Sequence, residues 1–341
     1  MKILKSTFFV LLILICGVVV FYFWGSAGKV SKNSYFNVKK YGEPDLVAID
    51  TFTVMTYNIG YLSGMTNNLP MERPESLFLG NLQGLNQLIR KQSPDLIGFQ
   101  EIDFGSNRSH FTNQMDSVAL SCNYAFGYQS INWDKNYVPF PYWPITNHFG
   151  QMLSGQAILS KYEIVDSETI ILEKPINGPF YYNAFYLDRL VQICQLAVNG
   201  RKLTLMNVHM EAFDVETREA QAHVVKGIYD TYADKGPTIL LGDFNSQPAW
   251  EINADKVMST FLSGNNIRSA ITEENYQASP SNFYTFDSDK PYQMIDYILY
   301  NPKYIELIDA SVLQNASQIS DHLPIVMKFV FSEVNDTMFI E

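Results

Sequence analysis

The chain has 341 residues, of which 47% are hydrophobic, and it carries a formal net charge of −11. This length and hydrophobic content allow a sizeable buried core and exclude a disordered chain. The net negative charge argues against a protein that binds nucleic acid mainly through a basic surface. It still allows a nuclease whose metal ion supplies positive charge. The spacing of the three cysteines does not fit a disulfide framework.

The first 27 residues predict a membrane segment. Residues 8–24 carry no charge, follow Lys2 and Lys5, and end in an aromatic run typical of a membrane interface. As a helix this stretch spans about 25 Å, and its small flanking residues can extend it across a hydrocarbon core of roughly 30 Å. We expect an uncleaved signal anchor that holds the following domain on the non-cytoplasmic side. The alternative is a signal peptide cleaved near Ala27, which would release a secreted protein.

The rest of the chain divides by composition. Residues 28–48 are polar and without a strong period, which predicts a tether between the membrane and the domain. We expect a single folded domain at residues 49–333 and a short C-terminal tail at residues 334–341. One domain is favoured over two because the polar residues at the ends of the apolar runs are spread from residue 58 to residue 322.

Apolar runs and amphipathic segments alternate within the expected domain. Short apolar runs that each end on a polar side chain predict buried strands at residues 53–58, 96–101, 203–209 and 238–245. Further strands are predicted at residues 156–164, 190–198 and 293–300. Helical spacing of apolar residues predicts helices at residues 76–92, 111–122 and 217–232. A core of two sheets with helices outside fits this order.

The acidic residues near the strand ends point to a divalent cation. Four carboxylates, those of Glu101, Asp243, Asp296 and Asp321, would repel one another if the fold gathered them without compensation. Oxygen ligands, together with neighbouring amides, suit Mg²⁺ or Mn²⁺, whereas the scarcity of paired His and Cys argues against a zinc site. Independently, an Asp beside a His forms a dyad that can move a proton.

The stretch from residue 133 to residue 149 is rich in aromatic residues and proline and nearly free of charge. Such a loop can dock on lipid, stack a base or a sugar, or pack as a satellite core. The sequence leaves these three alternatives open.

Seven segments in order resemble the endonuclease/exonuclease/phosphatase superfamily, which includes deoxyribonuclease I-like nucleases, abasic-site endonucleases, neutral sphingomyelinases and inositol-polyphosphate 5-phosphatases. The segments are Thr56-Tyr57-Asn58-Ile59, Phe99-Gln100-Glu101, Gly155-Gln156-Ala157-Ile158-Leu159-Ser160, Asn207-Val208-His209, Gly242-Asp243-Phe244-Asn245, Ile295-Asp296-Tyr297-Ile298 and Ser320-Asp321-His322-Leu323-Pro324. The resemblance covers about residues 50 to 330. It implies an α/β fold, a four-layered sandwich of two packed mixed β-sheets flanked by helices, and hydrolysis of a phosphate ester.

The resemblance also implies how the metal and the phosphate are held. It makes Glu101 the main metal ligand, with Asn58 beside it and Asp321 as a further ligand. Asp243 and Asn245 would face the phosphate, with Asp243 as a general base or as the group that orients the attacking water. The implied ion is Mg²⁺, with Mn²⁺ as the alternative.

The other motif residues receive supporting roles from the same resemblance. Asp296 would orient His322, whose imidazole can move a proton or bind the phosphate. His209 would bind the phosphate or assist the leaving group. Gln156 and Arg189 are weaker candidates for substrate binding.

The sequence therefore predicts a membrane-anchored, Mg²⁺-dependent phosphodiesterase whose substrate is nucleic acid or a lipid headgroup, with no obligate protein partner. The hypothesis from another class is a membrane-tethered binding module that keeps the fold without turnover. That module would be expected to lack a catalytic position, and none of the motif positions is missing.

Overall fold

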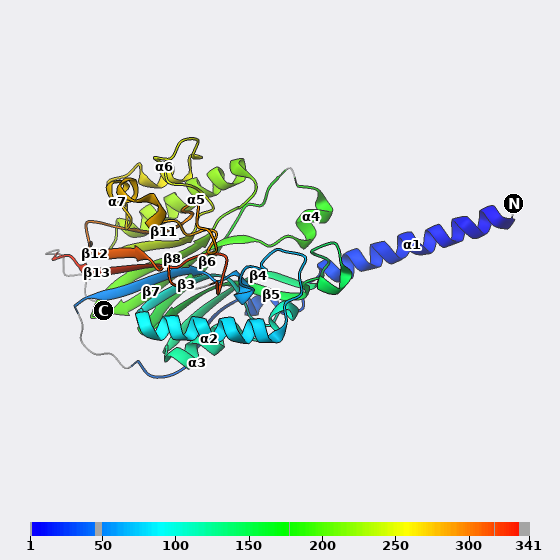
Figure 1. The fold of residues 1–341 in the computed structure, drawn as a ribbon, viewed down its shortest axis with the longest axis horizontal. Helices are drawn as coiled ribbons and strands as arrows, with labels where there is room; N and C mark the ends of the chain where they lie inside the picture. Colours follow the sequence, from blue (N-terminus) through cyan, green and yellow to red (C-terminus); the bar gives the residue numbers. More distant parts are fainter. Residues whose placement is uncertain (1, 45–49, 177, 317, 334–341) are drawn as a thin grey trace.

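The computed structural model describes residues 2–44, 50–176, 178–316 and 318–333. Figure 1 shows a body of two packed β-sheets with helices on the outside, and a single long helix, α1 (Lys2–Ser26), that projects away from it. The predicted α/β sandwich is confirmed. The predicted C-terminal tail and the last residues of the predicted tether lie outside the described residues.

Two mixed sheets form the body. The first has the strand order β1 (Phe36–Lys40), β4 (Phe126–Val138), β5 (Gly150–Ser160), β3 (Leu96–Asp103), β2 (Phe52–Asn58), β13 (Ile325–Phe331) and β12 (Ile305–Val312). The second has the order β10 (Arg268–Ser269), β11 (Asp296–Tyr300), β9 (Thr238–Asp243), β8 (Arg201–His209), β7 (Arg189–Val198) and β6 (Glu163–Leu172). All four apolar runs predicted as buried strands lie in these sheets.

Each sheet contains one parallel pair, and the two pairs pack against each other. β2 runs parallel to β3, with α2 (Glu75–Gln92) as the crossover, and β8 runs parallel to β9, with α5 (Val215–Ala233) as the crossover. The sheets approach closely here, since a Cβ atom on Gly98 of β3 would collide with Leu241 of β9. Because parallel strands end at the same edge, four strand ends meet on one side of the body.

Helices cover the outer faces. α2 packs beside α3 (Gln114–Cys122) on the first sheet, and α5 packs beside α6 (Val257–Leu262) on the second (Figure 1). The side chain of Asn113 accepts a hydrogen bond from the backbone N–H of Asp116, so α3 begins after that cap and not at residue 111. The short helices α4 (Phe180–Phe185) and α7 (Glu273–Ala278) lie in connecting segments.

Two local predictions are wrong. Residues 36–40 of the predicted tether form β1, which pairs along its length with β4. Its side chains are mostly exposed, so backbone pairing holds it and no burial period marks it in the sequence. The strand predicted at residues 156–164 spans a turn between β5 and β6, where the hydroxyl of Ser160 accepts a hydrogen bond from the backbone N–H of Tyr162.

The aromatic stretch splits into two parts. Trp133, Val138 and Phe149 are buried with residues from neighbouring elements in a small second core. Tyr142 and Trp143, in the loop between β4 and β5, are instead exposed by 73% and 75%. Packing therefore accounts for only part of this stretch.

Candidate active site

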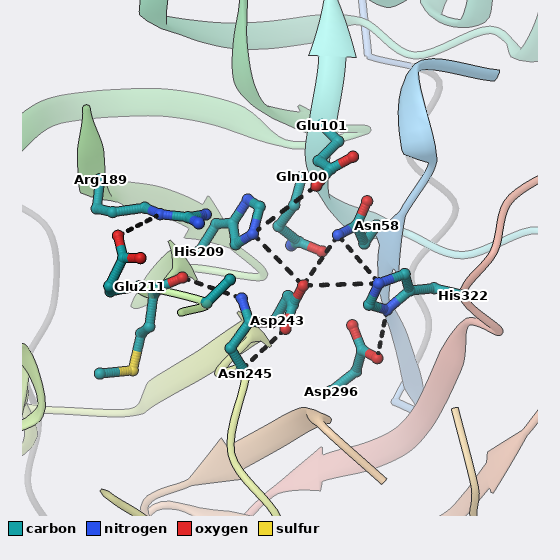
Figure 2. A network of polar contacts seen from close by, with 12 residues as sticks. Asn58, Gln100, Glu101, Arg189, His209, Glu211, Asp243, Asn245, Asp296 and His322 are labelled. Carbon is teal, nitrogen blue, oxygen red and sulfur yellow. Dashed lines mark hydrogen bonds and ion pairs between the residues drawn. The ribbon is translucent and has the colours of Figure 1, made fainter. Parts of the chain in front are cut away.

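The predicted site residues gather where the four parallel strand ends meet (Figure 2). Asn58 ends β2, Glu101 lies near the end of β3, His209 ends β8 and Asp243 ends β9. The remaining members come from the adjoining segments, namely Asn245 after β9, Asp296 at the start of β11, and Asp321 and His322 before β13. Residues more than 260 positions apart in the chain thus share one site, as the contact between Asn58 and His322 shows.

Asp243 is the centre of the polar network. Its Oδ2 accepts a hydrogen bond of 2.9 Å from Nδ2 of Asn58 and lies 3.5 Å from Nε2 of His209. Its Oδ1 accepts a hydrogen bond of 2.9 Å from the backbone N–H of Asn245. Burial, followed by the neighbouring carboxylate of Asp296, raises the pKa of Asp243 to about 7. A carboxyl with this pKa can accept a proton near neutral pH.

His322 and Asp296 form the dyad that the sequence predicts. Nδ1 of His322 lies 2.9 Å from Oδ2 of Asp296, and Nε2 lies 3.8 Å from Oδ2 of Asp243. Burial alone would lower the pKa of His322, but Asp296 and then Asp243 raise it well above its ordinary value. The hydroxyl of Ser320 accepts a hydrogen bond from the backbone N–H of His322, which fixes the turn. The ring is therefore charged and held with Nε2 toward the centre.

His209 differs from His322 in its charge. Burial, followed by Arg189 and His322, lowers the pKa of His209 well below its ordinary value. Its Nε2 lies 3.5 Å from Asp243 and 4.0 Å from Oε1 of Glu101. A neutral imidazole at this position can donate or accept one hydrogen bond without adding charge to the site.

Glu101 and Asp321 form a second, less buried cluster. Nδ2 of Asn67 lies 2.9 Å from Oε2 of Glu101, and 3.3 Å and 3.2 Å from the two carboxylate oxygens of Asp321. Glu101 has a φ of 50°, at an irregularity in the pairing of β3 with β5, and this turns its side chain toward the site. Burial, followed by the charge of Asp321, raises the pKa of Glu101.

These oxygens fit a divalent cation. Among the described residues, neither carboxylate forms an ion pair with a lysine or an arginine, and a hard cation would supply a positive charge in direct contact with both. A second group, Asp243, Asp296 and His322, also brings its ligand atoms within 4.8 Å of one another. That group already contains a charged histidine, so its charges are partly compensated. The donor set of Glu101 and Asp321, with the Asn58 side chain near them, therefore suits the ion better.

Arg189 lies at the edge of the site, and Figure 2 shows its guanidinium pointing toward His209. Its Nε lies 3.5 Å from Oε2 of Glu211, and its Nη2 donates a hydrogen bond of 3.1 Å to the hydroxyl of Tyr186. Its Nη1 is buried and has no hydrogen-bond partner among the described residues. Arg189 is thus placed to offer one free donor to a bound anion.

Gln156 is not brought to the site. Its Nε2 donates to the backbone oxygen of Asn207, within a buried polar layer between the two sheets that also contains Gln100 and Gln192. It does not line the cavity described below. This placement favours a structural role over substrate binding.

A cavity of about 720 Å³ opens above the polar network. Glu101, Asp243, Asn245, Asp321 and His322 line its floor. Its walls are mostly aromatic and include Trp133, Phe140, Tyr142, Tyr181, Tyr186 and Phe213. The cavity thus places polar chemistry beneath an apolar wall, an arrangement suited to a substrate with both kinds of surface.

Three residues of the site were missed by sequence reasoning. Asn67 lies in a turn between β2 and α2, where its type is ordinary for a turn. Tyr186 and Glu211 follow α4 and β8 and hold Arg189. Glu211 lies two positions after His209, and this proximity to a strand end was the only signal that could have found it.

Comparison with known proteins agrees with this geometry. The model of the endonuclease/exonuclease/phosphatase family matches residues 55–322. The chain belongs to this family. Enzymes of the family hydrolyse phosphate esters and generally use divalent metal ions. The resemblance seen in the sequence is therefore confirmed.

Sequence similarity to curated proteins is partial. Over 131 residues, which are 38% of this chain, the sequence is 28% identical to the UPF0294 protein of Vibrio cholerae. The match spans only 41% of the length of that relative.

Solved structures show the same fold at low identity. An endonuclease/exonuclease/phosphatase from Beutenbergia cavernae has 18% identity and a TM-score of 0.61, with 83% of this chain and 72% of that chain covered. A mannosyl-6-phosphatase from Bacteroides thetaiotaomicron has 18% identity and a TM-score of 0.57, with 82% and 100% covered. The catalytic domain of human Nocturnin has 19% identity and a TM-score of 0.56, with 87% and 98% covered.

Proposed function

We propose that the protein is a divalent-metal-dependent phosphodiesterase in which water attacks phosphorus. The observation that carries this proposal is the convergence of strand-end side chains from both sheets on Asp243, at the floor of a cavity (Figure 2). Family membership supports phosphate-ester hydrolysis. The choice of a diester and of Mg²⁺ as the ion, with Mn²⁺ as the alternative, belongs to the proposal.

In this proposal Asp243 takes a proton from the attacking water. Its raised pKa makes it a stronger base than an ordinary carboxylate, and the hydrogen bonds from Asn58 and Asn245 hold it in place. Nδ2 of Asn245 donates to the backbone oxygen of Met210, which fixes the amide beside the cavity. The water would be oriented by these groups before attack.

Protonated His322 would stabilise charge on the phosphate or give a proton to the leaving oxygen, while Asp296 keeps its ring oriented. Neutral His209 would hydrogen-bond a phosphate oxygen or the leaving group. Arg189, with its free Nη1, would contact a more distant anionic oxygen of the substrate.

Glu101, Asp321 and Asn58 would hold the metal ion, and Asn67 would orient the two carboxylates. When bound, the ion would stabilise the negative charge on the phosphate oxygens in the transition state. The role of Asn67 as an orienting partner follows from its shared contact with both acids.

The substrate would be a nucleic acid or a lipid headgroup phosphodiester, and the aromatic cavity wall supports a substrate with an apolar or ring-bearing portion next to the phosphate. The mannosyl-6-phosphatase with the same fold makes a phosphomonoester the competing class. The inactive binding module remains the alternative from another class.

We also propose that α1 anchors the domain in a membrane, with the domain on the non-cytoplasmic side. Residues Lys5–Ser26 form the one helix in the described part of the chain that is long and apolar enough to cross a bilayer, and only 6% of its apolar window is buried. A signal peptide cleaved near Ala27 is the competing reading. The intact mass of the protein extracted from membranes distinguishes them.

The test is hydrolysis by the full-length chain in detergent. Bis(4-nitrophenyl) phosphate and 4-nitrophenyl phosphate compare diester with monoester, and DNA, RNA, sphingomyelin and phosphatidylcholine follow. Each assay is run with EDTA, with Mg²⁺ and with Mn²⁺. Asp243→Asn is the test variant, and Asp309→Asn, at an exposed position on β12, is the matched control.

We expect metal-dependent turnover of the diester that is lost in Asp243→Asn and kept in Asp309→Asn. Turnover of the monoester alone would show that the protein is a phosphomonoesterase and not a phosphodiesterase. Metal binding without turnover of any substrate would favour the binding module.

A further inference from the structure

Exposed aromatic and aliphatic side chains stand on two elements that contribute to the cavity wall. We call this group the aromatic collar. It consists of Tyr142, Trp143 and Ile145 in the loop after β4, and Phe180 and Tyr181 in α4, with exposed fractions of 73%, 75%, 61%, 74% and 59%. Tyr142 and Tyr181 also line the cavity, so both the loop and α4 contribute to its wall. Clustered exposed apolar side chains of this size mark an interaction surface.

The elements that bear the aromatic collar also hold the end of α1. The ring of Tyr22 packs edge-on against Phe180 at 5.9 Å, and the ring of Phe21 stacks on Phe185 at 6.3 Å. The ring of Trp24 stacks on Tyr137 at 6.2 Å, at the base of the loop after β4. Figure 1 shows α1 leaving the body beside α4.

Hydrogen bonds fix the same junction. The backbone N–H of Asn136 donates to the oxygen of Ala27 at 2.8 Å, and its side chain donates to the oxygen of Trp24 at 3.0 Å. Nζ of Lys135 donates to the oxygen of Ser26 at 3.0 Å. The last carbonyls of α1 are thus capped by β4 rather than left to water. The C-terminal end of α1 is therefore held directly against β4 and α4 by hydrogen bonds and ring contacts.

The height of these contacts along α1 sets the level of α4 and of the end of β4, the elements from which the aromatic collar projects. Phe21 lies five residues before Ser26, so it lies about 7.5 Å deeper along the helix axis. Phe180 and Phe185 touch Phe21 and Tyr22 and therefore lie at the level of the last turns of a membrane-crossing helix. Amphipathic elements at membrane surfaces bury their apolar faces to about 5–10 Å, which matches this level.

From this geometry we infer that the aromatic collar inserts into the surface of the same bilayer that α1 crosses, and holds the cavity mouth against that surface. The occupant is the lipid bilayer itself. This inference rests on the proposed anchoring by α1, and it goes further in fixing which face of the domain meets the membrane.

The charge of the chain indicates which force holds the collar in place. With a net charge of −11, the protein gains no attraction to anionic lipid from its overall charge. Burial of aromatic side chains depends on area and not on ionic strength. Insertion is therefore expected in zwitterionic lipid and at high salt.

This orientation has a consequence for the substrate. A phosphate ester at the bilayer surface would enter the cavity that Tyr142 and Tyr181 line and reach Asp243 within it. The arrangement favours esters presented by the membrane over those that arrive from solution.

Quenching of tryptophan fluorescence by brominated lipid tests the inference. The chain has tryptophan at positions 24, 133, 143 and 250. The full-length chain, with its intact mass verified, is reconstituted in phosphatidylcholine vesicles with or without bromine on the acyl chains near the headgroup. Trp24→Phe removes the emitter on α1 and keeps an aromatic ring at that position. Trp143→Phe is then added to this background, and Trp250→Phe, in the segment before α6, is the matched control.

We expect quenching in Trp24→Phe that is largely lost when Trp143→Phe is added, and that is unchanged in high salt. The Trp250→Phe control should raise the quenched fraction, since it removes an emitter distant from lipid. Equal quenching with and without Trp143 would overturn the inference, as would loss of quenching in high salt. The readout needs no turnover, so it can fail or succeed independently of the proposed hydrolysis.

Discussion

Each sheet is built around one parallel pair of strands, yet the side chains at the ends of β2–β3 and β8–β9 differ in burial and in partners. On the first sheet the side chain of Glu101 is 15% exposed, and it shares Asn67 with the half-buried Asp321. On the second sheet the side chain of Asp243 is only 2% exposed and has histidines on two sides.

This difference indicates a division of labour between two clusters of side chains in the site. The more open carboxylates of Glu101 and Asp321 form no ion pair with a lysine or an arginine in the described part of the chain, and they suit a divalent ion. The carboxyl of Asp243 is buried, its pKa is raised, and two histidines lie beside it, which suits proton transfer. We call these the metal half and the proton half of the site, with Glu101 and Asp321 in the first and Asp243, Asp296 and His322 in the second.

The largest expected effect comes from Asp243→Asn in the proton half. The amide keeps a similar shape but cannot take a proton, so we expect kcat to fall by about 10²–10⁴-fold. Steady-state hydrolysis of bis(4-nitrophenyl) phosphate measures it, with Asp309→Asn as the control and thermal melting to confirm the fold. Activity close to that of the unsubstituted chain would remove Asp243 from the proton half.

Asp296→Asn should have a smaller effect, since it acts through His322. Removing the carboxylate that raises the pKa of His322 leaves a ring that loses its proton at lower pH. We expect kcat to fall by roughly 100-fold, with the alkaline limb of the pH profile moved to lower pH. A fall in rate with an unmoved limb would indicate a purely structural role for Asp296.

Asn67→Ala should weaken the metal half alone. Loss of the donor shared by Glu101 and Asp321 should lower the apparent metal affinity by about 10–100-fold, as removal of an orienting partner does. Saturating Mn²⁺ should restore kcat. Titration of activity with Mn²⁺ shows whether it does, and a kcat that stays low at saturation would place Asn67 outside the metal half.

The smallest expected effect is a shift in the acid limb of the pH–activity profile of the unsubstituted chain. The proposed base works deprotonated, and the pKa of Asp243 is raised to about 7, so activity should be lost as the pH falls through the acid limb. A bound cation favours the carboxylate and moves this limb below pH 7, yet above the ordinary Asp pKa of about 4. A profile of kcat/KM that stays flat down to that ordinary value would argue against Asp243 as the base.

The sequence was sufficient to predict the parts of this arrangement that depend on local pattern. Apolar runs identified all four strands of the two parallel pairs, because fully buried strands have continuous apolar sequences. The ordered motifs predicted which side chains meet, and the structure brings all but Gln156 of the predicted residues to the site.

The rest depends on contacts that a local pattern does not encode. β1 is held by backbone pairing at a sheet edge. Because its side chains are mostly exposed, its sequence lacks the continuous apolar run that predicted the buried strands. Asn67 reaches Glu101 and Asp321 only through the fold of the segment before α2. The junction of α1 with β4 and α4 likewise joins segments more than 100 residues apart, as the bond from Asn136 to Trp24 shows.

The most direct test of the division of labour is Mn²⁺ binding by isothermal titration calorimetry, in the unsubstituted chain, in Glu101→Gln and in Asp243→Asn. Glu306→Gln, at an exposed position on β12, is the control for Glu101→Gln. We predict that Glu101→Gln loses Mn²⁺ binding, while Asp243→Asn binds Mn²⁺ but does not turn over substrate. Binding kept in Glu101→Gln and lost in Asp243→Asn would contradict the account and move the ion to Asp243, Asp296 and His322.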